Sequence, residues 1–354
     1  MSSSGEKIKV GITIGDVNGI GIEVILKAFS DNRMLSVCTP IIYGSTKVLS
    51  YHKKAINNDE INFHSVPSAE KAIHKKVNVI NCWEGEVNIE LGHSTNEAGQ
   101  FALKSLECCV EDMAANKIDV MVTAPINKTN IQSKDFNFPG HTEYLANYSN
   151  TEDYLMILVA DELRVGVVTS HIALKDVPAA LTQEEIVRKA TILEASLVKD
   201  FGITKPKIAI LGLNPHAGDH GLMGDEESKV IKPAIKELSD KGMLAFGPYP
   251  ADGFFGSGSF NQFDGILAMY HDQGLAPFKA ITFDNGVNFT AGLPIVRTSP
   301  DHGTAYDLAG KNEASEISFR NAVYLACDIF AQRKESKELF ANPLEVSVKG
   351  RRDN

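Results

Sequence analysis

The sequence has 354 residues, of which 43% are hydrophobic and 23% are charged, the composition of a globular protein large enough for one big α/β domain or two lobes. Its formal net charge of −10 and its lack of basic runs argue against nucleic-acid binding, because a phosphate backbone needs a cationic surface. We found no signal-like stretch in residues 1–9 and no apolar run approaching the roughly 18 residues of a membrane span. We therefore expect a cytoplasmic protein that does not bind membranes, with its five cysteines reduced.

Short apolar runs alternate with longer amphipathic segments along the chain. The apolar runs have the length of buried strands, and they are Lys9–Ile14, Pro40–Tyr43, Val77–Asn81, Val120–Ala124, Tyr154–Ala160, Val165–Thr169, Ile208–Leu213 and Gly265–Met269. The segments with helical periodicity are Ile22–Phe29, Thr95–Asn116, Thr182–Phe201, Glu226–Gly242 and Ser318–Arg333. This alternation predicts an α/β fold with a largely parallel sheet.

Two local signals mark the ends of predicted elements. The segment Ile14–Glu23 follows a strand and opens a helix with a glycine-rich turn, as a ligand-binding βα turn would. It lacks the Gly-x-Gly-x-x-Gly pattern, and no Walker-type Gly-Lys-Ser/Thr occurs, so an ordinary Rossmann cofactor site is not predicted. Thr182 precedes Glu185 by three residues, which predicts a capped helix start.

Three histidines, His171, His216 and His271, directly follow predicted strands. Ligands of parallel α/β folds bind outside the carboxyl ends of the strands, so these side chains are candidates for one site. A single histidine there is more often structural, but three in equivalent positions leave both interpretations open. Neutral imidazoles suit zinc, cobalt and similar divalent ions. Three neutral ligands would leave the metal charge largely uncompensated, which suits a Lewis acid that binds an anionic substrate.

A second group of residues suits a phosphate. Its members are flanked by glycine, proline or small residues, and they are His141, Thr142, Lys279, Asn288 and Arg297. Lysine, arginine and histidine are the side chains that bind phosphate oxygens. Taken alone, Lys279 or Arg297 would also be explained as a solvated surface charge.

Four motifs, together with flanking sequence, resemble one known family along nearly the whole chain. The motifs are Val122–Lys128, Pro139–Glu143, Asn214–Gly218 and Leu267–Gly274. In this order and spacing they resemble the 4-hydroxythreonine-4-phosphate dehydrogenase family of pyridoxal phosphate biosynthesis. Two departures are visible: Val17 and Asn18 replace a Pro-Ala pair in the first turn, and His220 stands where relatives usually have a small residue.

The resemblance implies a fold like that of isocitrate and isopropylmalate dehydrogenases, with two α/β lobes and a cleft between them. Residues 1–125 and 300–354 would form the nucleotide-side lobe, and residues 126–299 the metal, substrate and dimerisation lobe. The family also implies a homodimer with a shared active site, in which one subunit lends His271 to its partner.

The resemblance assigns roles to the candidate residues. The metal ligands would be His171, His216 and His271, and the ion would be Zn, Co, Mg or Mn. The substrate contacts would be His141, Thr142, Lys279, Asn288 and Arg297. Segment Thr298–Gly310 looks like the nucleotide loop of isocitrate dehydrogenases, so NAD or NADP would bind at His302, Gly303, Thr304 and Asp307.

The implied reaction is the NAD-dependent oxidation and decarboxylation of 4-phosphooxy-L-threonine, a small phosphorylated hydroxy-amino acid, to 3-amino-2-oxopropyl phosphate. The residue that takes the hydroxyl proton stays open among Lys279, Asp272, Asp252 and a metal-bound water. One alternative is a dehydrogenase of 4-phospho-D-threonate or D-erythronate. A metal-dependent phosphatase or aldolase and a silent phosphosugar-binding protein are further alternatives, against which the nucleotide-like loop argues.

Overall fold

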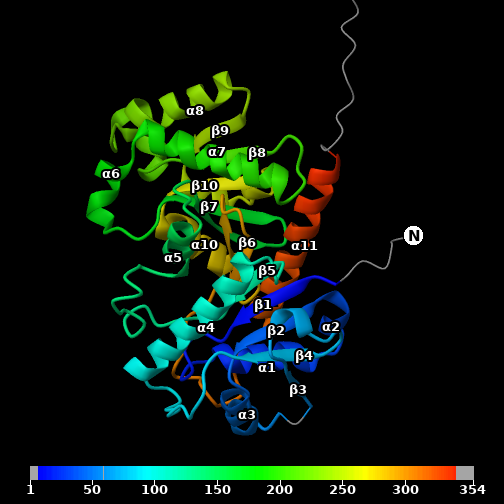
Figure 1. The fold of residues 1–354 in the computed structure, drawn as a ribbon. Helices are drawn as coiled ribbons and strands as arrows, with labels where there is room; N and C mark the ends of the chain where they lie inside the picture. Colours follow the sequence, from blue (N-terminus) through cyan, green and yellow to red (C-terminus); the bar gives the residue numbers. More distant parts are fainter. Residues whose placement is uncertain (1–6, 59, 340–354) are drawn as a thin grey trace, which may run out of the picture.

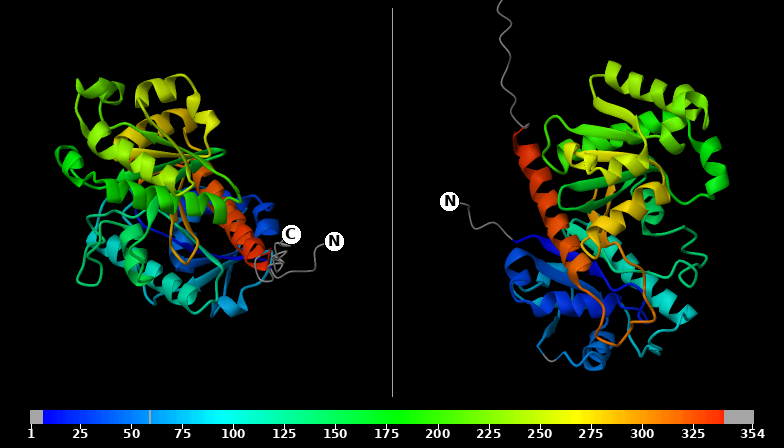
Figure 2. Two further views of the ribbon diagram at one scale, coloured as in Figure 1. Left: turned by 90° about the horizontal axis from the view of Figure 1, so that it is seen from above. Right: turned by 180° about the vertical axis from the view of Figure 1, so that it is seen from behind.

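The computed structural model describes residues 7–58 and 60–339, which form one 12-stranded sheet covered by helices on both faces (Figures 1 and 2). The strands are β1 Lys9–Thr13, β2 Thr39–Gly44, β3 Phe63–Ser65, β4 Val77–Asn81, β5 Val120–Thr123, β6 Leu155–Ala160, β7 Leu163–Thr169, β8 Lys207–Leu211, β9 Leu244–Tyr249, β10 Gly265–Tyr270, β11 Val287–Ala291 and β12 Arg297–Pro300. The α-helices are α1 Gly21–Ser30, α2 Met34–Val37, α3 Thr46–Ala55, α4 Asn96–Ala114, α5 His141–Tyr148, α6 Val177–Ala180, α7 Gln183–Lys199, α8 Lys232–Asp240, α9 Ala251–Gly256, α10 His271–Thr282 and α11 Ile317–Leu339. No helix in these described ranges is long and apolar enough to cross a membrane.

The strand order is β3-β4-β2-β1-β5-β12-β11-β6-β7-β10-β8-β9. Six neighbouring strands at one end, β3, β4, β2, β1, β5 and β12, form one parallel block. Four strands at the other end, β7, β10, β8 and β9, form a second parallel block. Between the blocks, β11 pairs antiparallel with β12 and β6, and β6 pairs antiparallel with β7. The prediction of a largely parallel sheet is therefore confirmed, and the antiparallel pairings are confined to its centre. Only Asp161 and Glu162 connect β6 to β7, too short a link for the crossover that parallel strands need.

All eight predicted strands are present, and the predicted helices appear as α1, α4, α7, α8 and α11 with shifted ends. The predicted start of α7 is confirmed, since Thr182 Oγ1 accepts a hydrogen bond of 3.1 Å from the Glu185 amide. The pattern missed β3, β9, β11 and β12 and the helices α3, α5 and α10. Helix α10 contains Gly274 and Pro277, which interrupt a helical signal in a sequence.

The two faces of the sheet are covered differently. One face carries a continuous core whose buried residues come from α1, α7, α8 and α11, among other elements. The opposite face carries two separate cores, one at α4 and α5 and another at α9 and α10. The two lobes thus share a core behind the sheet and are divided in front of it.

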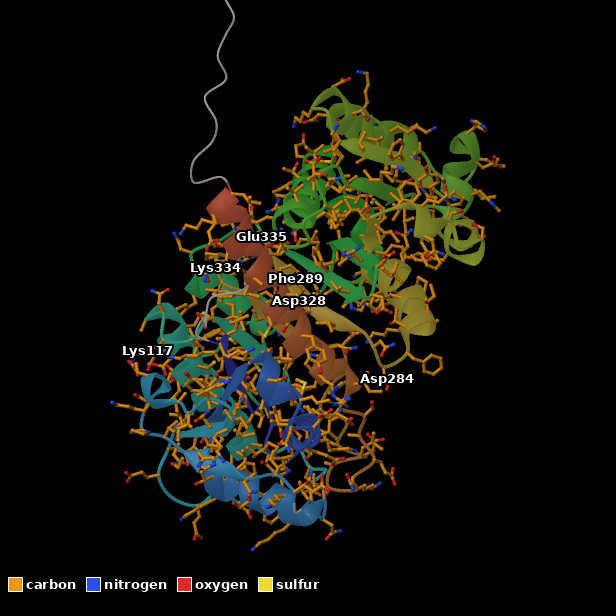
Figure 3. The ribbon with its side chains drawn as sticks, turned by 90° about the vertical axis from the view of Figure 1, so that its right-hand side faces the viewer. Lys117, Asp284, Phe289, Asp328, Lys334 and Glu335 are labelled. Atoms are coloured by element: carbon orange, nitrogen blue, oxygen red, sulfur yellow. The ribbon has the colours of Figure 1, made fainter. Side chains whose placement is uncertain are left out.

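Helix α11 joins the lobes on the shared face. It packs against β5, β11 and β12, and Figure 3 shows Phe289 of β11 beside it. Phe289 is fully buried. Its neighbours in the strand, Asn288 and Thr290, point to the opposite face because side chains alternate along a strand. Between the two separate cores, the surface of the sheet is therefore formed by polar residues of its central strands.

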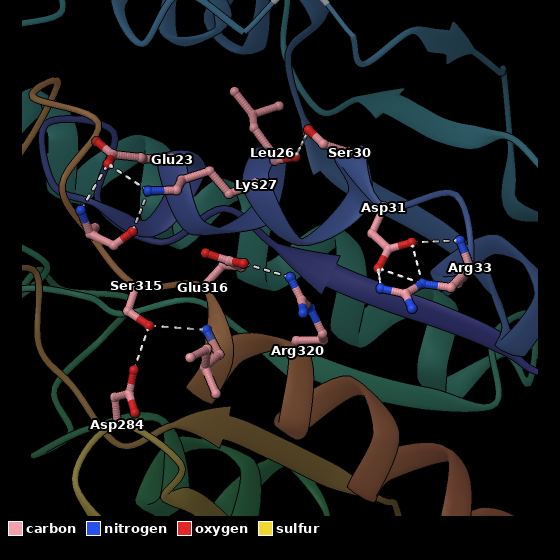
Figure 4. A network of polar contacts seen from close by, with 12 residues as sticks. Glu23, Leu26, Lys27, Ser30, Asp31, Arg33, Asp284, Ser315, Glu316 and Arg320 are labelled. Atoms are coloured by element: carbon pink, nitrogen blue, oxygen red, sulfur yellow. Dashed lines mark hydrogen bonds and ion pairs between the residues drawn. The ribbon is translucent and has the colours of Figure 1, made fainter.

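The segment before α11 is tied to α1 and to the turn before β11 (Figure 4). Glu23 accepts a hydrogen bond of 3.1 Å from the Ala314 amide, and Lys27 donates to the Ala314 carbonyl at 2.6 Å. Ser315 donates to Asp284 at 2.7 Å. These contacts fix the far end of the predicted nucleotide loop. The predicted lobe boundaries stay a prediction, and residues 1–6 and 340–354 of the first lobe lie outside the described residues.

Candidate active site

A cavity of about 290 Å³ lies over the polar floor of the sheet. Register places Asn288 of β11 opposite Ser299 of β12 and Leu158 of β6, so these residues share one face. The first turn of α5 and the helix α10 form its walls. The predicted site residues that line this cavity are His141, Thr142, His171, His271, Lys279, Asn288, Arg297, His302 and Gly303. The structure thus gathers all five predicted substrate contacts.

Arg297 is the strongest sign of an anion in this cavity. Its side chain is 3% exposed, and its guanidinium donates to Thr123 Oγ1 at 2.6 and 3.1 Å and to Thr290 Oγ1 at 3.3 Å. Within the described ranges no carboxylate forms an ion pair with it. Burial lowers the pKa of Arg297 to about 10, so the group keeps its proton at neutral pH. Its hydrogen-bond partners are only hydroxyls, and the Glu143 carboxylate acts on it through space without bonding to it, so the buried guanidinium is suited to an anionic ligand.

Several buried polar atoms in the same cavity have no hydrogen-bond partner among the described residues. They are His141 Nε2, Glu143 Oε2, Asn288 Oδ1 and His302 Nε2. Burial, with the nearby charges of Arg297 and Lys128, holds the pKa of His141 well below its usual value, so its imidazole is neutral. Because unpaired buried polar groups are costly, their clustering indicates a polar ligand.

Two of the predicted metal ligands lie together at the mouth of this cavity. The rings of His171 and His271 are 6.1 Å apart between centroids. His171 Nδ1 lies 3.3 Å from Glu143 Oε1, and His271 Nδ1 lies 2.6 Å from Asp272 Oδ1. The nitrogen of each ring that does not face a carboxylate is Nε2. Lys128 Nζ lies 3.5 Å from the Nε2 of His171.

The third predicted ligand, His216, lines a separate cavity together with Asp252 and Asp272. His171, His271 and His216 follow β7, β10 and β8, which are adjacent and parallel, so the three strand ends do meet at one edge. Nevertheless, no group of three His, Cys, Asp or Glu side chains in residues 7–58 and 60–339 is arranged to hold a metal ion. One chain brings two of the three histidines together.

The turn that carries His216 has an unusual backbone. Five consecutive residues, His216 to His220, have left-handed φ values between 40° and 81°. Such a conformation costs roughly 1–2 kcal/mol for each non-glycine residue, so the surrounding structure must impose it. The buried carboxylate of Glu227 anchors the residues just before this run by accepting hydrogen bonds from the Leu213 and Asn214 amides at 2.8 and 2.7 Å. Glu227 opens a π-helical turn, Glu227–Ile231, ahead of α8.

The predicted nucleotide loop is held by the turn between β1 and α1. The Ile20 amide donates to the Thr304 carbonyl at 3.0 Å, and the Tyr306 hydroxyl donates to Asp16 Oδ2 at 2.8 Å. This glycine-rich turn is entirely buried, so it supports the loop and does not itself face a ligand. Asn18, one of the departures from the family pattern, donates to the His93 carbonyl at 2.9 Å.

Predicted residues of the nucleotide loop take different positions. His302 and Gly303 line the cavity, whereas Thr304 is half-buried and Asp307 is exposed. Burial lowers the pKa of His302, and its Nδ1 donates to the Gly303 carbonyl at 3.1 Å. His302 therefore presents an Nε2 lone pair to the cavity.

The structure separates the three candidates for the catalytic base. Of these, Lys279 lines the same cavity as Arg297. Its ammonium contacts the Asp301 carbonyl at 2.9 Å and the Asp301 carboxylate at 3.0 Å. Burial raises the pKa of Asp301, against the lowering effect of Lys279. Asp272 is paired with His271, and Asp252 belongs to the cavity of His216.

Sequence reasoning left three charged residues of the cavity without a role, namely Lys128, Glu143 and Asp301. Lys128 and Glu143 stand inside motifs that carried the family resemblance, but neither follows a strand directly nor adjoins glycine. Only the fold shows that they face His171 from opposite sides. Burial alone would raise the pKa of Glu143, but the hydrogen bonds from His171 and from its own amide prevail and lower it, so the carboxylate is ionised.

Comparisons with known proteins match the chain over most of its length. A family model described as pyridoxal phosphate biosynthetic protein PdxA matches residues 36–326. The chain is 53% identical over 349 residues to a 4-hydroxythreonine-4-phosphate dehydrogenase of Bacteroides thetaiotaomicron, covering 98% of this chain and 96% of that protein. A crystal structure of a 4-hydroxythreonine-4-phosphate dehydrogenase from Klebsiella pneumoniae superimposes with a TM-score of 0.80 at 32% identity, covering 93% of this chain and 99% of the other. A relative from Oceanobacillus iheyensis, provisionally named D-threonate 4-phosphate dehydrogenase, is 37% identical, covering 90% of this chain and 97% of that protein.

Proposed function

Because the chain belongs to the PdxA family of pyridoxal phosphate biosynthetic proteins, we propose that it is an oxidoreductase that uses NAD or NADP to oxidise and decarboxylate 4-phosphooxy-L-threonine. The product would be 3-amino-2-oxopropyl phosphate. A cytoplasmic location and the use of both a nicotinamide and a divalent metal are part of the proposal.

The observation that carries the proposal is the buried, carboxylate-free guanidinium of Arg297. Each of its terminal nitrogens retains an N–H beyond the bonds to Thr123 and Thr290, and a planar guanidinium fits two phosphate oxygens at once. Thr142, Lys279 and the neutral His141 line the same cavity and would complete the phosphate contacts. The Asn288 amide would hold an oxygen of the substrate.

The donor set fits a divalent metal in part. His171 and His271 both turn Nδ1 toward a carboxylate, the arrangement that leaves Nε2 as the metal-binding nitrogen. The family resemblance implies a homodimer with a shared site, in which His171 and His216 of one subunit would meet the His271 of the other in place of the His271 of their own chain. A divalent ion bound there supplies Lewis acidity toward the substrate hydroxyl and the carbonyl formed from it.

NAD or NADP would bind at the loop that contains His302, Gly303, Thr304 and Asp307, and it supplies the hydride acceptor. The Ile20 amide and the Asp16 carboxylate fix this loop beside the cavity. A fixed loop holds the substrate and the cofactor in one orientation, which is how positioning lowers a barrier.

Lys279 is the candidate that the geometry favours for moving a proton at the substrate. It is the one among the three candidate residues that lines the cavity with Arg297. Its ammonium is in contact with the carboxyl group of Asp301, and burial raises the pKa of that carboxyl. The Lys279 ammonium would also contact the phosphate group of the substrate, so substitution of Lys279 would affect both substrate binding and turnover.

A second candidate function is the oxidation of 4-phospho-D-threonate or D-erythronate. The 37% identity to the Oceanobacillus relative favours keeping it, because the phosphate contacts would serve either substrate. NADH formation with 4-phosphooxy-L-threonine and with each amine-free analogue separates the two. We expect the highest kcat/KM with the amino acid phosphate. A higher value with an analogue would transfer the assignment to the second function.

A further inference from the structure

The hydrogen-bond partners of His171 determine which of its ring nitrogens carries the proton. Lys128 Nζ lies 3.5 Å from the Nε2 of His171, and Glu143 Oε1 lies 3.3 Å from its Nδ1. A lysine ammonium can only donate a hydrogen bond, and an ionised carboxylate can only accept one. The two contacts are therefore mutually consistent for a single neutral tautomer, with hydrogen on Nδ1 and a lone pair on Nε2.

The fold places the Glu143 carboxylate beside the Nδ1 of the His171 ring. Glu143 is the third residue of α5, in its first turn, while His171 follows β7. The side chain of Glu143 is 19% exposed and that of His171 is 36% exposed. The carboxylate is thus anchored on a helix in the cavity wall, whereas the imidazole stands at the open mouth and needs a partner to fix its rotamer.

We propose that Glu143 is a positioning residue that fixes the Nδ1–H tautomer and the orientation of His171, so that its Nε2 lone pair points at the metal position. Lys128 marks that direction, since its ammonium lies 3.5 Å from the same Nε2. The inference rests on the proposed metal role of His171, but the tautomer itself can be measured without metal.

The experiment compares full-length wild type with Glu143→Ala, Glu143→Gln and a matched control, Glu152→Gln, which removes one carboxylate from an exposed site after α5. Two readouts are needed. The first is the ¹⁵N spectrum of metal-free protein labelled at histidine, with His171 assigned by its absence from the spectrum of His171→Gln. The second is cobalt(II) affinity by titration calorimetry.

We expect an Nδ1–H signal for His171 in wild type and in Glu152→Gln, and a mixture of tautomers in Glu143→Ala. Cobalt affinity should fall roughly 10- to 100-fold in Glu143→Ala, as for other lost partners of metal-binding histidines. Glu143→Gln, whose amide oxygen still accepts from Nδ1–H, should keep the tautomer and lose less affinity. The thermal unfolding temperature of each variant shows whether the fold is intact.

Two outcomes would overturn the inference. One is an unchanged tautomer and unchanged cobalt affinity in a folded Glu143→Ala. The other is an equal loss of affinity in Glu143→Gln and Glu143→Ala with the wild-type tautomer in both, which would show that Glu143 acts only through its charge. Failure of wild type to bind cobalt would instead contradict the proposed metal site, and the tautomer comparison would still decide the role of Glu143.

Discussion

At the scale of single residues, the buried charge of Arg297 organises the candidate site. Its hydrogen-bond partners are neutral hydroxyls and the Glu143 carboxylate acts on it only through space, so the guanidinium keeps free donors for an anion. Arg297→Lys keeps the charge but removes the planar fork. We expect a loss of about 2 kcal/mol of substrate binding, or roughly thirtyfold in KM, measured by steady-state kinetics. The control is Arg33→Lys on the surface. An unchanged KM for the phosphorylated substrate would refute the role of Arg297.

His52 of α3 provides a test of acid sensitivity. It is fully buried, and its Nε2 donates to the Val17 carbonyl at 2.8 Å in the turn that supports the nucleotide loop. Burial lowers the pKa of His52 to about 4, whereas the unfolded chain should titrate near 6.5. The unfolded state therefore binds the proton first as the pH falls, and stability is lost between pH 6.5 and 4 by about 1.4 kcal/mol per pH unit.

Replacing His52 by Gln keeps a donor for Val17 but removes the titration. Urea unfolding at neutral pH and near pH 5 should show a smaller acid-induced loss in His52→Gln than in wild type, even if the variant is less stable at neutral pH. Equal losses in the two proteins would mean that His52 is not the group responsible.

At the scale of elements, the left-handed turn before α8 shows how backbone geometry places His216. A Cβ added at Gly218 would lie 2.6 Å from Glu227 Oε2, whereas one added at Gly221 would meet nothing within 4 Å. Both glycines have positive φ, of 81° and 98°. Gly221→Ala should therefore cost only the backbone term, about 1 kcal/mol.

Gly218→Ala should cost more, since it also displaces the carboxylate that holds the Leu213 and Asn214 amides. We expect a further loss of about 1–3 kcal/mol in denaturant unfolding and weaker metal binding. Equal stability of Gly218→Ala and Gly221→Ala would contradict the role of Glu227 in the turn.

The success of sequence reasoning differs between elements for physical reasons. Buried strands such as β1 and β5 were recognised because short apolar runs of this length most often form buried strands. Strands β11 and β12 were missed because β11 alternates polar residues on the cavity face with apolar residues on the other, and β12 contains Arg297, Thr298 and Ser299, in runs of only five and four residues. Yet this polar face holds Asn288 and Arg297, which were found by their residue types. The contact of Glu143 with His171 depends on long-range packing and leaves no local pattern.

At the scale of the whole molecule, the sheet joins two lobes through one shared core and leaves the site between the two front cores. One chain brings His171 and His271 together but places His216 in another cavity. This geometry alone would have His216 as the missing ligand, whereas the family resemblance implies that His271 is the exchanged one; on the family ground we predict a dimer in which each site takes His271 from the other subunit. This arrangement can be tested with two inactive variants, His216→Ala and His271→Ala.

When these variants are unfolded, mixed in equal amounts and refolded, a mixed dimer should contain one complete site. Statistical mixing then gives about a quarter of the wild-type activity, measured as NADH formation. If all three histidines came from one chain, the mixture would stay as inactive as its components.

The measurement that tests the central claim most directly is product formation by chelator-treated protein supplied with 4-phosphooxy-L-threonine and NAD. Zinc, cobalt, magnesium or manganese is added back in turn, and NADH, carbon dioxide and inorganic phosphate are measured together. The account predicts equal amounts of NADH and carbon dioxide, formed only when metal and nicotinamide are both present. Release of inorganic phosphate without NADH, or full NADH formation without metal, would contradict it.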